Sequence, residues 1–92
     1  MIHVEALRTL LRYEAETGKL FWLPRTPDMF AGGEQSPAHS CAIWNKRFAG
    51  KEALTAEAGR GYRQGAIFGV KCFAHRAAWA LFAGAWPEAD VD

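Results

Sequence analysis

The residues best suited to bind a soft metal ion lie in two short stretches of the chain. His39 and Cys41 are separated by a single residue, and Cys72 and His75 form a Cys-x2-His pair. Cysteine thiolates and histidine nitrogens are the ligands that zinc prefers. No Cys-x2-Cys pair is present, however, and Cys72 lies in a predicted strand, so the spacing signal is weak. We therefore expect no metal and no other cofactor.

His75 is also the residue that one would first test as a general base. It belongs to a set at helical spacing that also holds Ala78, Trp79 and Phe82. This spacing indicates a buried, hydrogen-bonded structural histidine instead. No carboxylate or serine lies at a spacing that suggests a catalytic triad with His75. A triad is recognised from the geometry of its residues in the fold, so spacing along the chain could not reveal one. We expect no catalytic residue, and we interpret the acidic end, with Glu88, Asp90 and Asp92, as exposed rather than as a metal site.

The most informative chemical pattern is a run of positive charge in the middle of the chain. The whole sequence has 11 Lys and Arg against 10 Asp and Glu, a net charge of +1, which is low for a non-specific nucleic-acid binder. Between positions 44 and 76, only Glu52 and Glu57 oppose seven cations. With Tyr62, these cations are the predicted nucleic-acid-binding residues: Lys46, Arg47, Lys51, Arg60, Arg63, Lys71 and Arg76.

The length and composition predict one globular domain spanning residues 1–92. Half of the 92 residues are hydrophobic and four are tryptophans, which is typical of a folded chain with a modest core. We expect most of the large aromatics to be core residues. The sequence shows no signal-peptide pattern and no apolar run of about 20 residues, the length of a membrane span. We therefore expect a cytoplasmic protein with reduced cysteines and no membrane partner.

The hydrophobic pattern predicts a small α+β fold, with an N-terminal helix, a short antiparallel sheet of about three strands and a C-terminal helix. The helices are expected over residues 3–13 and 74–83, with Gly84 ending the second. The strands are expected over residues 20–23, 62–67 and 70–73. Phe68 and Gly69 suit a hairpin turn, and on this register Arg63 and Lys71 share a region of surface. Residues 25–43 have little periodicity and predict a long irregular loop.

Several phrases, read in order, resemble one protein family. They are YEAETGKLFW at residues 13–22, WNKRFAGKEA at 44–53, Gly61-Tyr62, AHRAAWAL at 74–81, GAWP at 84–87, and Val91-Asp92. Together they are similar to the N-terminal part of the HNH endonucleases of phages and prophages, relatives of the intron homing enzymes. The resemblance covers nearly the whole chain, except for the segment between Thr26 and Ile43.

The resemblance also implies which catalytic groups this sequence lacks. In the family, an Asp-His pair opens a ββα-metal motif, in which the histidine activates water and a divalent metal stabilises the phosphate charge. The aspartate of that pair corresponds to Asp92, the last residue given. The resemblance therefore implies a non-enzymatic chain, and a longer parent would be a metal-dependent endonuclease.

Three functions remain open from the sequence. The first is a non-catalytic module that binds double-stranded DNA through the basic residues. The second is a phage-encoded protein that binds a host nuclease or CRISPR effector and inhibits it, which the near-neutral charge favours. The third is a fragment of an active HNH nuclease. The DNA target, the protein partner and the oligomeric state do not follow from the sequence.

Overall fold

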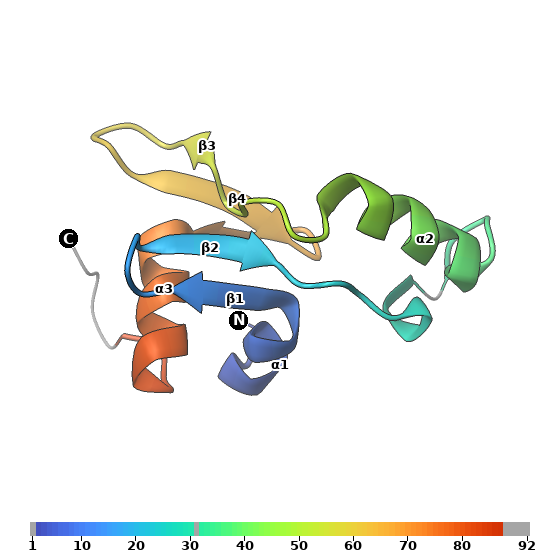
Figure 1. Cartoon of the computed structure of the whole chain (residues 1–92), viewed down its shortest axis with the longest axis horizontal. Coiled ribbons are helices and arrows are strands. Elements are labelled where there is room, and N and C mark those ends of the chain that lie inside the picture. The colour runs from blue at the N-terminus through green and yellow to red at the C-terminus, as the bar shows by residue number, and fades with distance from the viewer. Residues whose placement is uncertain (1, 31, 88–92) are drawn as a thin grey trace.

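The computed structural model describes residues 2–30 and 32–87 and has an α+β fold (Figure 1). Helices stand at both ends of the described chain, as the sequence predicts. In chain order the elements are α1 (Val4–Leu10), β1 (Leu11–Glu14), β2 (Lys19–Trp22), the 3₁₀ helix η1 (Pro27–Phe30), α2 (Pro37–Phe48), β3 (Ala56–Glu57), β4 (Arg63–Ile67), β5 (Val70–Phe73) and α3 (Ala74–Ala83).

The strands form two antiparallel sheets. The first pairs β1 with β2 across a turn in which Gly18 has a φ of 75°. The chain after α2 runs along the other side of β2, where the Trp22 amide donates to the Lys51 carbonyl at 2.9 Å and the Ala53 amide donates to the Leu20 carbonyl at 2.8 Å. The second sheet has the order β3-β4-β5, and its strands β4 and β5 are the predicted strands 62–67 and 70–73. The predicted strand 20–23 is instead β2 of the first sheet, and β3 was not predicted.

The first helix is shorter than the sequence predicts. It ends at Leu10, and the chain turns at once into β1, whose Tyr13 is paired with Leu20. The apolar residues whose helical spacing predicts that helix, Val4, Leu7, Leu10 and Leu11, are nevertheless all buried. Pairing with β2 satisfies the backbone of residues 11–14 as well as a longer helix would, and it also buries Leu11, so tertiary contacts override the local pattern.

The β4–β5 hairpin confirms the predicted turn but contradicts one prediction about its surface. Phe68 and Gly69 have φ values of 50° and 78°, as a two-residue hairpin of the primed type requires. Ala66 is paired with Lys71, so Lys71 lies on the face opposite to that of Ile67 and Arg63. The expectation that Arg63 and Lys71 share a region of surface is therefore wrong.

The core forms where α3 meets both sheets and α1 (Figure 1). The packed side of α3 carries Ala77 and Ala80, each fully buried, whereas Trp79 is 44% exposed and Phe82 is 75% exposed. The prediction that Trp79 and Phe82 lie on the buried face is therefore wrong. Small alanines let the helix approach the strands closely, so the leucines of α1 and β2 and Ile67 of β4 fill the core.

A further correction concerns the segment predicted to be an irregular loop. Residues 25–43 contain η1 and the first half of α2. The Ser36 hydroxyl accepts a hydrogen bond from the His39 amide at 3.2 Å, and Pro37 occupies the first helical turn. Serine followed by proline is a standard helix start. Periodicity gave no sign of this helix because Cys41 is its one fully buried residue.

Gly65 of β4 allows the closest approach between the second sheet and the chain before it. A Cβ at this position would lie 2.7 Å from Leu54 Cδ2 and 3.1 Å from Leu54 Cα. Leu54 is itself buried and has a φ of 57°.

We predict that Gly65→Ala lowers the free energy of unfolding by about 1–3 kcal/mol through overpacking, measured by urea denaturation. Gly33→Ala, where a Cβ meets nothing within 4 Å, is the matched control, and an equal effect of both would refute this account.

Cys72 links the stability of the core to pH. Its thiol is buried beside Gly65, and this burial raises the pKa of Cys72, an effect that the nearby positive charge of Arg76 opposes. The unfolded thiol then ionises at a lower pH than the folded one, so stability falls as the pH rises through the thiol range, from about 8.5 upward. We expect denaturation curves at increasing pH to show this loss in wild type and in Cys41→Ala, and a smaller loss in Cys72→Ala. Identical pH profiles for all three proteins would contradict it.

Candidate nucleic-acid interface

Helix α2 and η1 form an arm that projects from the rest of the molecule (Figure 1). The two elements pack chiefly against each other. The arm accounts for the elongated shape, whose principal extents are 40, 23 and 22 Å. Any surface on α2 is therefore presented away from the core.

Two side chains of α2 fix the arm to the chain that leaves β2. The Arg25 amide donates to Asn45 Oδ1 at 2.8 Å, and Asn45 Nδ2 donates to the Arg25 carbonyl at 3.0 Å. The Cys41 thiol donates to the same carbonyl at 3.2 Å. Asn45 thus pairs with both backbone groups of Arg25 as a neighbouring strand would, which satisfies polar groups that are partly buried.

The side chain of Arg25 lies among three aromatic rings, and we call Arg25, Trp22, Trp44 and Phe68 the Arg25 cluster. The guanidinium carbon is 3.9 Å from the centre of the Trp44 ring, 4.6 Å from that of Phe68 and 5.3 Å from that of Trp22. Such contacts attract a cation to the ring faces. Burial lowers the pKa of Arg25 from its ordinary value, but a guanidinium remains charged at neutral pH.

The hairpin turn contributes Phe68 to this cluster despite an unfavourable backbone conformation. A bulky residue with a positive φ costs roughly 1–2 kcal/mol, and Phe68 has a φ of 50°. Phe68 is 54% exposed, so burial offsets only part of that cost. Stacking on Arg25 offsets a further part, and it connects the second sheet to the arm.

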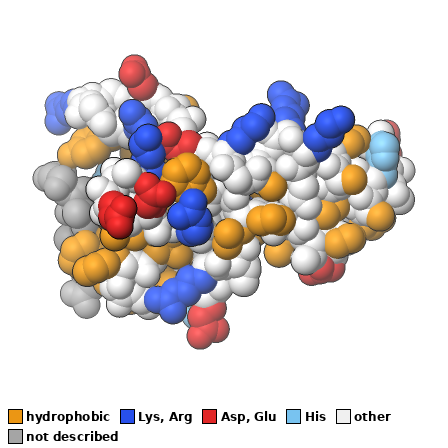
Figure 2. Space-filling model, viewed as in Figure 1, with side chains coloured by type: hydrophobic (Ala, Val, Ile, Leu, Met, Phe, Trp, Pro, Cys, Tyr) orange, Lys and Arg blue, Asp and Glu red, His pale blue; other side chains and the backbone are white. Residues whose placement is uncertain are grey.

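Three of the seven predicted cations lie in the last turn of α2 and just after it, where the arm joins the rest of the molecule. Lys46 and Arg47 are in the last turn of α2, and Lys51 follows after a turn closed by its amide, which donates to the Phe48 carbonyl at 2.9 Å. All three are exposed, and none forms an ion pair with a described carboxylate. We call them the basic edge. Figure 2 shows Lys and Arg side chains gathered over α2 and the adjoining chain.

The structure separates the other four predicted cations from the basic edge. Arg60 is in the turn between β3 and β4, which Figure 1 places at the opposite end of the molecule from α2. Arg63 is neutralised by Glu52, with 3.0 Å between Nη1 and Oε2. Lys71 is on β5 and Arg76 is on α3. The seven cations therefore do not share one face.

His75 is partly packed, although not as the sequence predicts. Its ring stacks on Tyr62 with 4.7 Å between ring centres and lies 5.6 Å from the ring of Phe73. Its buried Nδ1 has no hydrogen-bond partner in the described part of the chain. The residue is a packed aromatic, and the expectation that it is hydrogen-bonded is wrong for Nδ1.

Within residues 2–30 and 32–87, no group of three or more His, Cys, Asp or Glu side chains could hold a metal ion. Glu88, Asp90 and Asp92 lie outside the described residues. None of the described helices is both long enough and apolar enough to span a bilayer.

No protein-family model, curated protein or solved structure matches this chain. Support for a function therefore comes from the described side chains.

We predict that Arg25→Lys destabilises the protein more than the same change at Arg12, which stacks only on Phe21 and lies at the surface. Lysine keeps the charge but not the planar group that contacts three rings, so the expected loss is about 1–2 kcal/mol at Arg25. At Arg12 we expect less than about 0.5 kcal/mol. Urea denaturation followed by tryptophan fluorescence measures both. Equal losses would show that the three rings around Arg25 contribute no more than the single ring beside Arg12.

Proposed function

We propose that this chain is a non-catalytic module that binds double-stranded DNA, with the basic edge in contact with the phosphate backbone. The observation that supports it is the grouping of Lys46, Arg47 and Lys51 where the arm joins the rest of the molecule. Helix α2 contains no acidic residue. Cations that are exposed and unopposed gain the most from displacing the counterions of DNA.

An alternative explanation for two of these cations is local helix stability. Lys and Arg in the last turn interact favourably with the helix dipole, by roughly 0.3–1 kcal/mol each. That explanation does not cover Lys51, which follows the helix. Arg47 lies over the ring of Phe48 at 5.3 Å, which limits the side-chain freedom that would be lost on binding.

The Arg25 cluster gives this edge a fixed position relative to the rest of the molecule. Trp44 of the cluster and Lys46 and Arg47 of the edge belong to the same helix. Phosphate contacts set the register and orientation of a protein on a duplex, and a defined position of the cations on the folded protein favours such contacts. In this proposal Arg25 positions the contacts, and sequence preference depends on side chains that reach a groove.

The similarity of residues 44–53 to a block of HNH endonucleases agrees with this proposal, because that block contains the whole basic edge. We propose that the chain acts in the bacterial cytoplasm and has no catalytic role or metal of its own. The other predicted cations lie on other surfaces and would contribute to DNA binding only through the overall electrostatic potential of the protein: Arg60, Arg63, Lys71 and Arg76.

The test compares two triple variants that remove the same charge. Lys46→Ala with Arg47→Ala and Lys51→Ala removes the basic edge, while Arg8→Ala with Arg12→Ala and Lys19→Ala removes three exposed cations of α1, β1 and β2. Binding to a short duplex is measured over a salt series, with magnesium present to detect cleavage. We expect the first variant to bind more weakly and its logarithmic salt slope to fall by about 2–3, because each phosphate contact contributes about 0.9.

The second variant should bind as wild type does, apart from a small effect of net charge. Equal weakening of binding in the two variants would mean that only the overall charge matters. It would refute the proposal that the basic edge contacts the phosphates. Absence of wild-type binding at low salt would refute the DNA-binding function itself. Cleavage of the duplex would contradict the non-catalytic part.

The apolar surface supports a second candidate function, which is binding to a host nuclease or CRISPR effector as an inhibitor. Trp79 and Phe82 on α3 and Phe68 at the hairpin tip are large and exposed, and such residues are more common at protein interfaces than on ordinary surfaces. A complex of this kind would persist in moderate salt, unlike a phosphate-based one. Size-exclusion chromatography with a purified effector, in low and in moderate salt, distinguishes the two.

A further inference from the structure

Helix α2 has an outer face that the phosphate contacts use only in part. Its packed side consists of residues with buried or half-buried side chains: Cys41, Trp44, Asn45 and Phe48. With about 3.6 residues per turn, the opposite side of the helix is centred on Ile43, with His39 one turn before it and Lys46 one turn after it. All three are exposed, so they form one continuous stripe along the outside of the arm.

The outer face of α2 matches the major groove of DNA in charge and in size. The helix contains no acidic residue, and its last turn carries Lys46 and Arg47. A helix with its side chains is about 10–12 Å across, the major groove is about 12 Å wide and the minor groove about 6 Å. Because α2 packs chiefly against η1, its outer side is not covered by the described core elements. The major groove can therefore accept this helix, and the minor groove cannot.

The position of the basic edge directs the rest of the helix over the base pairs. From the basic edge, α2 runs outward to the far end of the arm (Figure 1). Ile43 lies about 5 Å along the helix axis from Lys46 and Arg47, and His39 lies about 6 Å beyond Ile43. When the cations contact phosphates at the margin of the groove, Ile43 and His39 are carried into it.

The stripe contains one apolar and one hydrogen-bonding side chain suited to base edges. Ile43 is 50% exposed, and alanine would favour the helix more at such a position, so helix stability does not explain an isoleucine there. In the major groove an apolar side chain contacts the methyl group of thymine. The amide of His39 donates to the Ser36 hydroxyl, which fixes its backbone, and its exposed imidazole can donate to the N7 acceptor of a purine.

We propose that α2 is a recognition helix that lies in the major groove, where Ile43 contacts a thymine methyl group and His39 donates a hydrogen bond to a purine N7. This inference rests on the proposed DNA-binding function, because it takes the basic edge as the phosphate contact. It adds the groove, the two base-reading residues and the base features that they read. An exposed isoleucine is also common on ordinary surfaces, and in that case binding would not depend on the thymine methyl group.

The test of Ile43 begins with selection of the duplexes that wild type prefers, from a pool of short duplexes with a randomised centre. In the selected duplex each thymine is replaced in turn by uracil, which removes only the methyl group. We expect wild type to bind about three- to fourfold more weakly at one of these positions, the effect of one buried methyl group. Ile43→Ala should show no such effect. Replacement of guanine by inosine removes an amine from the minor groove and should leave binding unchanged.

His39 is tested in the same duplex with purines that lack the N7 acceptor. Replacing one purine by its 7-deaza analogue should weaken wild-type binding roughly two- to tenfold, as expected for one hydrogen bond. His39→Ala should lose this response and keep the response to uracil, while Ile43→Ala should do the reverse. Loss of both responses in either variant would overturn the separate roles of the two residues.

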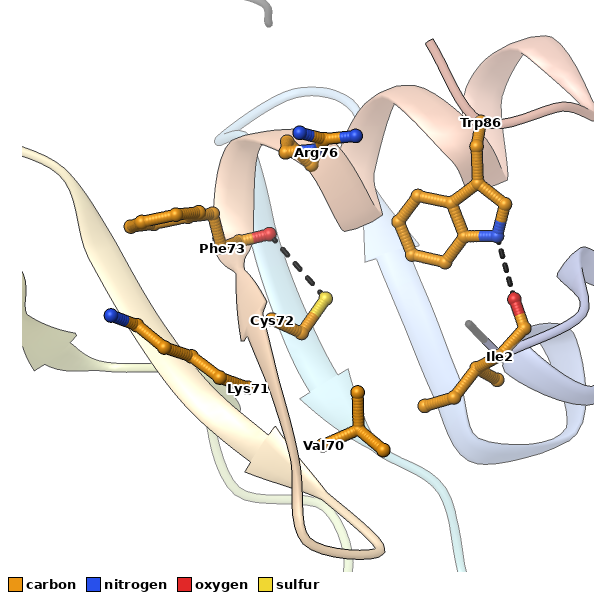
Figure 3. A pocket seen from close by; sticks show the side chains of 7 residues that line it. All are labelled: Ile2, Val70, Lys71, Cys72, Phe73, Arg76 and Trp86. Carbon is orange, nitrogen blue, oxygen red and sulfur yellow. Dashed lines mark hydrogen bonds between the residues drawn. The ribbon is translucent and has the colours of Figure 1, made fainter. Parts of the chain in front are cut away.

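Val70→Ala is the matched control for Ile43→Ala. Val70 is also β-branched and 45% exposed, but it lines a cavity together with Ile2 and Trp86 (Figure 3), so this variant should keep every wild-type response. Sensitivity to inosine and not to uracil would place the contact in the minor groove and overturn the proposal. Salt-dependent binding without any preferred sequence would overturn the recognition helix alone, whereas no binding at low salt would refute the DNA-binding function as well.

Discussion

The position of Arg25 is the constraint on which the candidate interface depends. A guanidinium removed from part of its water is held by the faces of three rings, and its backbone is held by Asn45. The rings come from β2, α2 and the β4–β5 turn, so one side chain links the first sheet, the arm and the second sheet. A carboxylate partner would have neutralised the charge, whereas aromatic partners leave the cluster positive.

The features that local sequence determines were predictable. The hairpin turn at Phe68 and Gly69 and the end of α3 at Gly84, whose φ is 81°, follow from residues that tolerate or require a left-handed backbone. The buried face of α3 was not predictable in this way. Hydrophobicity alone favours Trp79 and Phe82 over Ala77 and Ala80, but the spacing between helix and sheet favours the small side chains, and that spacing is a tertiary property.

The candidate site was predicted only in part for the same reason. Charge counting identified Lys46, Arg47 and Lys51 because they are close in sequence, but it grouped them with cations that the sheet register and α3 place elsewhere. Arg25 was missed because two of its three ring partners, Trp44 and Phe68, are distant in the chain and its own neighbours are prolines and threonine. A cation–π cluster has no fixed sequence spacing, so only the fold reveals it.

The narrow attachment of the arm has a consequence for how the molecule unfolds. Since α2 packs chiefly on η1 and has one fully buried residue, opening the arm would expose little of the core. Local opening therefore costs less free energy than global unfolding, and the amides of α2 should exchange with solvent through partial unfolding. The helix that carries Lys46 and Arg47 thus belongs to a part of the fold that can open separately from the core, and a ligand on the basic edge would stabilise the arm before it stabilises the core.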